Sequence, residues 1–324
     1  MLPQSWLLEA QERIAPHILR TPLTYDKDLD LYIKWENRQN GGSFKLRGAL
    51  TKVLSLQPWE VQRGLVAASA GNHGIGVATA GKLRLAPVAI FASEQAVPRK
   101  IQAMCDLGAE VRLVEGGYGE AEAAGKAYAA LHGSIWISPY NDGQVIAGQG
   151  TLGLEILDQQ PELENAIWVV PVGGGGLISG IGAAIQLRSQ PDLAAPRVRL
   201  VGVQSEASPF FQTLFYHGSQ QNVVELPSLA DGLSGPVEEG SLTVSFVRKY
   251  VDELVLVSED ELERAISAAY HRYHEVIEGS AAVSLAAVLS GKVPDRPAVL
   301  VISGGNIQPE KHSDILARHP ADRW

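Results

Sequence analysis

Short apolar runs bounded by glycine or proline alternate along this chain with stretches of helix-like pattern, most of them 10 to 15 residues long. This rhythm is typical of βαβ units, in which parallel strands are buried on both faces. Four of the runs cluster between residues 64 and 139. We therefore predict an α/β protein of two domains, each a mostly parallel twisted sheet flanked by helices. The runs are 31–36, 64–69, 86–93, 109–116, 134–139, 166–173, 198–205, 252–258 and 297–305.

The predicted strand ends also indicate where a ligand binds. In open α/β sheets, ligands lie beyond the carboxyl ends of the strands. Three loops rich in glycine and polar residues fall there, at 69–74, 172–177 and 303–306. Residues 166–187 are uncharged over a length that could span a bilayer, but Pro171 and four consecutive glycines interrupt them. We read that segment as strand, loop and helix.

Composition narrows the classes of partner. The 324 residues carry a net charge of −9, and no block of lysine and arginine interleaved with aromatic residues is present, so we expect neither nucleic acid nor membrane as a partner. One cysteine, Cys105, cannot form an internal disulfide, and we interpret it as a small buried helix residue. Pro3 and Glu9 stand where a signal peptide would be basic and then apolar. We expect a cytoplasmic protein.

The run Gly173 to Gly176 carries the clearest chemical signal. It follows a predicted buried strand and precedes a predicted helix, so free backbone amides and the helix dipole form an anion-binding nest. Residues 173–187 contain no lysine or arginine, so backbone donors must neutralise the anion. We predict a phosphate site, with tight packing of helix on sheet as the alternative. A nucleotide P-loop is excluded because its Gly-Lys-Ser/Thr ending is missing.

A second signal is Lys45 in "GGSFKLRGA", where the neighbouring glycines let the backbone approach a ligand closely. The alternative is an ordinary turn followed by a helix. A reactive lysine, a phosphate nest without basic side chains and polar loops at strand ends together suit pyridoxal 5'-phosphate. That cofactor offers an aldehyde to the lysine and a phosphate to the nest.

Other patterns point elsewhere. Gly148, Gly150 and Gly153 match G-x-G-x-x-G, but no strand precedes them and no acidic residue follows at the required distance, which disfavours a nicotinamide site. Ser69 in "AASAGNHG", with Asp231 and His271 or His274, has the residue order of a serine hydrolase, although the nucleophile turn lacks its first glycine.

A possible metal site lies near residue 275. The segment "HRYHEVIE" places two histidines and two glutamates along one predicted helix face, at a spacing that could bind metal, although a solvated or packed face is the favoured interpretation. These residues are His271, His274, Glu275 and Glu278.

Five ordered segments give a specific resemblance: "KWENRQNGGSFKLRGA", "SAGNHG", "IAGQGTLGLEIL", "VGGGGLISG" and "SGGN". In this order they resemble the serine/threonine dehydratase and serine racemase family of fold type II, the tryptophan synthase β-like fold. The resemblance implies deamination of L-threonine and L-serine to 2-oxobutanoate and pyruvate plus ammonia. It also implies a small amino acid as substrate, a homodimer, a large cofactor-binding domain (1–50 and 143–324) and a small substrate-loop domain (51–142).

The resemblance assigns roles to individual residues. Lys45 would attach to the cofactor aldehyde, with Ser43 beside it and Phe44 packing on the ring. Asn72 would hydrogen-bond the ring hydroxyl, and Ser303 would face the pyridine nitrogen. The phosphate would be held by Gly173, Gly174, Gly175, Gly176 and Leu177. The substrate carboxylate would be bound by Ser69, Ala70, Gly71, Asn72 and His73.

Departures from the family pattern limit the assignment. Some members bind a divalent cation through acidic side chains, but the aligned positions here are Gln204 and Phe210, with Glu206 between them, so we expect no metal. Racemases of this family carry a serine where this chain has Ala70. Because the sequence ends about twenty residues after "SGGN", we expect no regulatory domain. The alternatives are a serine racemase, a dehydratase for 3-hydroxyaspartate, or a non-catalytic binding protein on the same scaffold.

Overall fold

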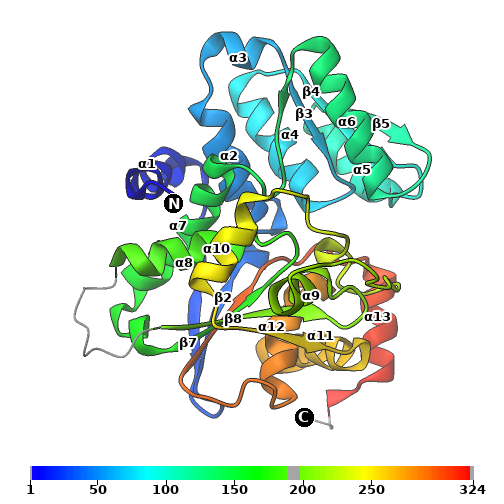
Figure 1. Cartoon of the computed structure of the whole chain (residues 1–324). Helices are drawn as coiled ribbons and strands as arrows, with labels where there is room; N and C mark the ends of the chain where they lie inside the picture. The colour runs from blue at the N-terminus through cyan, green and yellow to red at the C-terminus, as the bar shows by residue number, and fades with distance from the viewer. Residues whose placement is uncertain (1, 189–197, 322–324) are drawn as a thin grey trace.

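The computed structural model describes residues 2–188 and 198–321, and two separate sheets organise them (Figure 1). Within these residues the larger sheet has six strands in the order β1-β2-β10-β7-β8-β9, and the smaller has four in the order β5-β4-β3-β6. The strands are β1 (Leu23–Asp26), β2 (Leu31–Trp35), β3 (Leu65–Ala68), β4 (Val88–Ser93), β5 (Glu110–Val114), β6 (Ile135–Trp136), β7 (Ile167–Pro171), β8 (Arg199–Ser205), β9 (Glu253–Val257) and β10 (Ala298–Ile302).

The predicted two-sheet α/β architecture is confirmed, and each of the nine apolar runs contains a strand. Strand β1 was missed. It pairs antiparallel with β2, whereas the other pairings in both sheets are parallel among the described residues. Its four residues are half-buried or exposed, so this edge strand has no apolar run to reveal it.

Helices cover both faces of each sheet. The α-helices are α1 (Gln4–Ile14), α2 (Lys45–Ser55), α3 (Pro58–Gln62), α4 (Asn72–Arg84), α5 (Pro98–Asp106), α6 (Tyr118–His132), α7 (Gly143–Gln159), α8 (Gly176–Arg188), α9 (Phe210–His217), α10 (Leu242–Tyr250), α11 (Glu259–Tyr273), α12 (Gly279–Leu289) and α13 (Pro309–Arg318). The 3-10 helices are η1 (Ala15–His17), η2 (Glu36–Arg38), η3 (Asn40–Gly42), η4 (Pro161–Asn165) and η5 (Asp231–Leu233).

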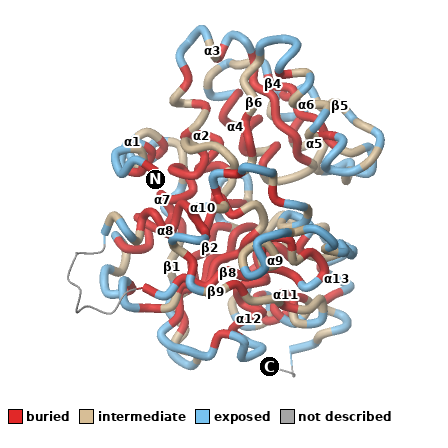
Figure 2. The backbone as a smooth tube through the Cα atoms, viewed as in Figure 1, coloured by how far each residue is buried: buried red, intermediate tan, exposed pale blue. Residues whose placement is uncertain are grey.

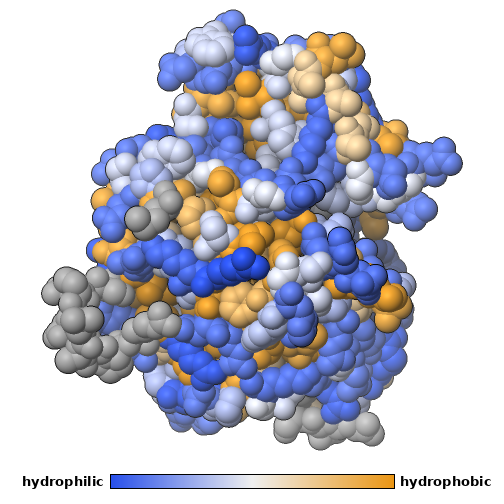
Figure 3. Space-filling model, in the orientation of Figure 1, coloured by the Kyte–Doolittle hydropathy of each residue, from blue (hydrophilic) through white to orange (hydrophobic). Residues whose placement is uncertain are grey.

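Alternate residues of each buried strand contribute to different cores, as the period of two requires. In β10, Leu300 joins a core with α11 and α12, while Val299 and Val301 join a core with α7 and α8. In β3, Ala67 packs with α2 and α4, while Val66 packs with α6. Figure 2 shows this buried backbone along the sheets and helices α7 and α8. The viewed surface is largely hydrophilic (Figure 3).

The sheets fit the proposed division of the chain into residues 1–50 with 143–324 and residues 51–142. Each strand of the smaller sheet lies inside the second part, and each strand of the larger sheet lies inside the first. Helix α2 crosses the boundary at residue 50 and packs on the smaller sheet through Leu46 and Val53. The domain boundary within this helix therefore stays a proposal.

The uncharged segment from residue 166 forms strand β7, a glycine loop and helix α8, as predicted. None of the helices in the described part of the chain is both long enough and apolar enough to cross a membrane.

Candidate active site

Lys45 is the first residue of helix α2, and backbone contacts with the C-terminal part of the chain fix its position. Ser43, two residues before Lys45, is extended and forms an isolated β-bridge with Gly304. The amide of Phe44 donates to the carbonyl of Ser303 at 3.1 Å. Two predicted motifs, about 260 residues apart in the sequence, are thereby brought together at the carboxyl end of β10.

The Lys45 amine lies between the two parts of the chain. Its Nζ donates to the carbonyl oxygen of Pro139, which follows β6 of the smaller sheet, at 3.0 Å. Burial lowers the pKa of the Lys45 ammonium to about 8, and the negative charge of Glu278 acts in the opposite direction. At pH 7 roughly a tenth of this amine is neutral, compared with less than about 0.1% of a free lysine. The site therefore activates the amine before any covalent bond forms.

Residues 69–71 connect strand β3 to helix α4, which begins at Asn72 and includes His73. The first amides of a helix have no intrahelical partner, and with the helix dipole they attract a carboxylate. The Ser69 hydroxyl accepts a hydrogen bond from the Gly71 amide at 3.1 Å. In the described residues no histidine hydrogen-bonds Ser69, so the hydrolase arrangement is not formed.

The ring of His73 faces a backbone carbonyl and is uncharged at neutral pH. Its Nε2 lies 2.8 Å from the carbonyl oxygen of Ile137, and its Nδ1 is buried without a partner among the described residues. Burial and the neighbouring Lys45 ammonium lower the pKa of His73 to about 3. A neutral ring whose Nε2–H donates to a carbonyl supplies no charge to a substrate carboxylate. We therefore assign any carboxylate binding by this residue to its backbone amide.

The glycine loop between β7 and α8 has the geometry that an anion requires. Gly175 has φ of +82°, and a Cβ there would lie 2.7 Å from Phe211 Cε2, so a side chain is excluded by both conformation and space. Within the described chain, the amides of Gly173, Gly174 and Gly175 donate to no protein group. The 13-residue helix α8 begins at Gly176. These donors fit a phosphate without a basic side chain.

Ser303 directly follows strand β10 and is 2% exposed. Its carbonyl is occupied by Phe44, while its hydroxyl has no protein partner among the described residues. It lies beside the motif that carries Lys45, and its role at the ring nitrogen stays a prediction. The lysine, the free amides and this hydroxyl together provide what a cofactor with an aldehyde, a phosphate and a ring nitrogen needs.

Two polar residues at the site were not assigned to the cofactor site from the sequence, where Glu278 was named only as a candidate metal ligand. Glu278 Oε1 accepts from Asn72 Nδ2 at 2.6 Å, and Asn306 Nδ2 donates to Asn72 Oδ1 at 2.7 Å. Asn306 belongs to the "SGGN" motif but received no role. Glu278 immediately precedes the apolar helix α12, and an acidic residue in that position is the signal that could have found it.

The proposed helix face near residue 275 is wrong. Helix α11 ends at Tyr273, and His274 adopts a left-handed conformation with φ of 58°. Glu275 instead contacts Asn37 and Arg38, and Glu278 turns toward Asn72. In the described residues no group of three or more His, Cys, Asp or Glu side chains is arranged to hold a metal ion.

The structure also places three further groups of residues that the sequence singled out. Gly148, Gly150 and Gly153 lie inside helix α7, where Gly150 allows close contact with the backbone of Gly180, so they pack helices. Cys105 is exposed, which corrects the expected buried position. Gln204 Oε1 accepts from the amide of Gln212, at 2.7 Å, and so supports helix α9. Phe210 is buried at the start of that helix.

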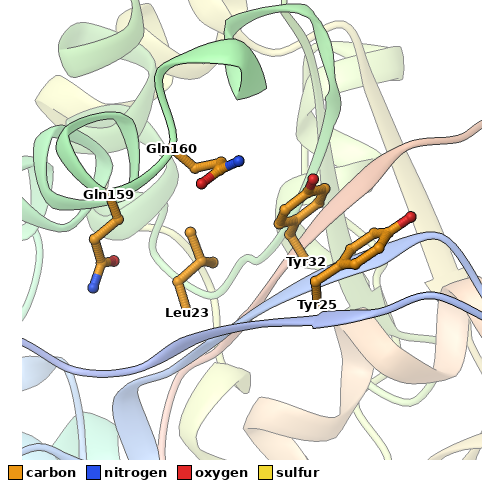
Figure 4. Close-up of a pocket in the computed structure, with 5 residues that line it drawn as sticks. All are labelled: Leu23, Tyr25, Tyr32, Gln159 and Gln160. Atoms are coloured by element: carbon orange, nitrogen blue, oxygen red, sulfur yellow. The ribbon is translucent and has the colours of Figure 1, made fainter.

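A surface pocket of about 320 Å³ lies apart from these residues (Figure 4). It is formed by β1, β2 and the end of α7, and none of its lining residues belongs to the predicted site. They are Leu23, Tyr25, Tyr32, Gln159 and Gln160.

Comparisons with known proteins show the family and the fold of this chain. An L-threonine ammonia-lyase of Thermotoga maritima is 42% identical over 306 residues, covering 92% of this chain and 74% of that protein. The solved processed form of threonine deaminase isoform 2 from Solanum lycopersicum is 29% identical with a TM-score of 0.86, covering 97% of this chain and 92% of that one. A solved serine racemase of Dictyostelium discoideum is 32% identical with a TM-score of 0.83, covering 94% of this chain and 98% of that one.

The family described as "Pyridoxal-phosphate dependent enzyme" matches residues 14–304, which contain every predicted site residue. The match therefore includes Lys45, the glycine loop and Ser303 together. This chain belongs to the family of pyridoxal-phosphate dependent enzymes.

Proposed function

We propose that this protein deaminates L-threonine and L-serine by eliminating the β-hydroxyl group, giving 2-oxobutanoate or pyruvate and ammonia. One observation carries the proposal: the Lys45 amine has a pKa of about 8 and lies in a site with a phosphate nest and a helix N-terminus for a carboxylate. The threonine ammonia-lyase at 42% identity supports the same reaction.

Different residues of the site bind the cofactor and move the proton. The amides of Gly173 to Gly176, with Leu177, hold the phosphate, and Phe44 packs on the ring. Pyridoxal phosphate, when bound, supplies the electron sink that makes the Cα proton acidic. Lys45 removes that proton, because a general base works best when its pKa lies near the working pH. The β-hydroxyl takes up the proton that Lys45 then holds and leaves as water, and the remaining enamine hydrolyses to the 2-oxo acid and ammonia.

The substrate is oriented by the N-terminus of α4. We propose that the backbone from Ser69 to His73 binds the α-carboxylate, because its amides and the helix dipole favour an anion. The hydroxyl of Ser303 faces the ring nitrogen and, being neutral, does not hold it protonated. A weaker electron sink favours rapid loss of the β-substituent over longer-lived carbanion chemistry.

Racemisation is the second candidate, because a solved serine racemase shares 32% identity with this chain. It requires a proton donor on the face of the substrate opposite Lys45. Ala70 offers none. Ser69 is 9% exposed, and its hydroxyl accepts from the Gly71 amide. We therefore favour elimination.

The test compares the native protein with Lys45→Ala and with Lys52→Ala as the matched control. Lys52 lies on the same helix and pairs with Asp142 at 2.7 Å. Formation of 2-oxo acid is measured for L-threonine, L-serine and 3-hydroxyaspartate, with and without a chelator. We expect turnover of threonine and serine in the native and Lys52→Ala proteins, independent of metal. Lys45→Ala should lose both turnover and the visible absorption of the bound cofactor.

Retained turnover in Lys45→Ala would overturn the proposal. A stable cofactor band without turnover of any amino acid would instead identify a binding protein. Preference for 3-hydroxyaspartate would assign a different dehydratase. We further propose a homodimer, as the family resemblance implies, and a cytoplasmic location, as the single cysteine favours.

A further inference from the structure

A chain of hydrogen bonds links four segments that are distant in sequence, with Asn72 between Asn306 and Glu278. Asn306 Nδ2 donates to the backbone carbonyl of Gly41 at 2.9 Å and to Asn72 Oδ1 at 2.7 Å. Asn72 Nδ2 in turn donates to Glu278 Oε1 at 2.6 Å. The side-chain amide of Asn72 is therefore held at both of its polar atoms.

Glycines make room for this chain at both ends. A Cβ on Gly42, which has φ of +76°, would lie 2.6 Å from Asn306 Oδ1. A Cβ on Gly304 would overlap Glu278 Oε1. Backbone hydrogen bonds also hold these segments side by side. The Gly305 amide donates to the Gly42 carbonyl at 2.9 Å, and the Glu278 amide donates to the Gly304 carbonyl at 3.2 Å. These glycines admit polar side chains that act on Asn72.

The direction of the Asn72 amide follows from the chemistry of its partners. The Gly41 carbonyl accepts only, so it fixes which end of the Asn306 amide is the NH₂ group. That NH₂ group requires an acceptor on Asn72, which is Oδ1. An ionised carboxylate also accepts only, so Glu278 requires the NH₂ group of Asn72. Both partners select the same orientation, and the second N–H of Asn72 Nδ2 remains for another acceptor.

The Glu278 carboxylate is free for this role. Glu278 is the N-cap residue of α12, yet its side chain makes no capping hydrogen bond. The charged groups around it are Lys45 of α2, Lys100 of α5 and Asp231 of η5, and Lys100 and Asp231 lie 4.0 Å apart. Burial and then the charge of Asp231 raise the pKa of Glu278 to about 7, against the effects of Lys100, Asn72 and Asn306.

We propose that Glu278 is a positioning residue that, with Asn306, orients the amide of Asn72 so that its remaining N–H points to the ring hydroxyl oxygen of the cofactor. The inference rests on the proposed contact of Asn72 with that oxygen. When Glu278 is protonated it becomes able to donate, so its preference for the NH₂ group of Asn72 weakens. The hydrogen bond from Asn72 to the ring oxygen is therefore strongest above neutral pH and weakens as the pH falls.

The test uses cofactor binding and absorption, which do not depend on turnover. Glu278→Gln keeps an acceptor oxygen for Asn72 but cannot titrate, Glu278→Ala removes the acceptor, and Glu275→Gln is the control. Glu275 lies three residues earlier and is bonded to Asn37 at 2.7 Å. Each protein is freed of cofactor, titrated with pyridoxal phosphate for the dissociation constant, and scanned in the visible range from pH 5.5 to 9.

For the native protein and Glu275→Gln we expect an absorption change with a midpoint near the pKa of Glu278, about 7. Glu278→Gln should lose this change while its dissociation constant stays within about threefold, and Glu278→Ala should bind roughly tenfold more weakly, as expected for one lost hydrogen bond. An unchanged midpoint in Glu278→Gln, or native affinity in Glu278→Ala, would overturn the inference. If the native protein shows these expected readouts but turns over no amino acid, the result counts against the proposed reaction and not against this inference.

Discussion

Replacement of Arg47 by methionine should destabilise the protein strongly, because it removes the cation that pairs with a fully buried carboxylate. Arg47 stands two residues after Lys45 on helix α2. Its Nε and Nη2 donate to the two oxygens of Glu36, each at 2.8 Å, and its Nη1 lies 3.0 Å from Glu155 Oε2. The side chains of Arg47 and Glu36 are both 0% exposed.

The expected loss follows from what remains after the replacement. Glu155 keeps the ammonium of Lys34 at 2.5 Å, but among the described residues Glu36 keeps only the hydroxyl of Thr21 at 2.6 Å. Breaking a buried pair by removing one partner costs about 3–5 kcal/mol in the free energy of unfolding. The control is Arg264→Met, since the Arg264–Asp260 pair is exposed and one helical turn apart. An exposed pair of this kind contributes about 0.3–0.5 kcal/mol.

Urea unfolding of the cofactor-free proteins, followed by tryptophan fluorescence, measures these differences. The double variant Glu36→Leu with Arg47→Met removes both charges and should recover part of the loss, because no unpaired carboxylate remains buried. A loss below about 1 kcal/mol for Arg47→Met, or a double variant less stable than the single one, would refute this account.

Two further predictions concern the chemistry of the site. The rate at which cofactor-free protein binds pyridoxal phosphate should rise about tenfold per pH unit and level off near pH 8, because the neutral amine of Lys45 is the nucleophile; a rise continuing to pH 10 would contradict the lowered pKa. The native protein should convert negligible L-serine to D-serine, whereas Ala70→Ser should gain measurable racemisation. Chiral analysis of the serine that remains after partial turnover measures both. Abundant D-serine from the native protein would favour a racemase.

The sequence predicts the main elements because local patterns reflect backbone periodicity. Buried parallel strands appear as short apolar runs, and the strand–glycine–helix order around residue 175 predicts the anion nest. The same reasoning fails where the local signal is weak. Strand β1 is half-exposed, and helix α11 ends at a left-handed His274 although the polar pattern continues. The exposure of Cys105 likewise depends on which face of α5 packs against the sheet, and the local sequence does not show this.

The α/β class and the order of the motifs can be read from the sequence, and so can the prediction of Lys45 as the reactive lysine, because each depends on local patterns of residues. Only the tertiary structure brought Gly41, Asn72, Glu278 and Asn306 into one line of hydrogen bonds. It also turned the ring of His73 to a backbone carbonyl, where burial keeps it neutral. These properties arise from long-range packing, because burial and neighbouring charge are set by segments that lie far apart in the sequence.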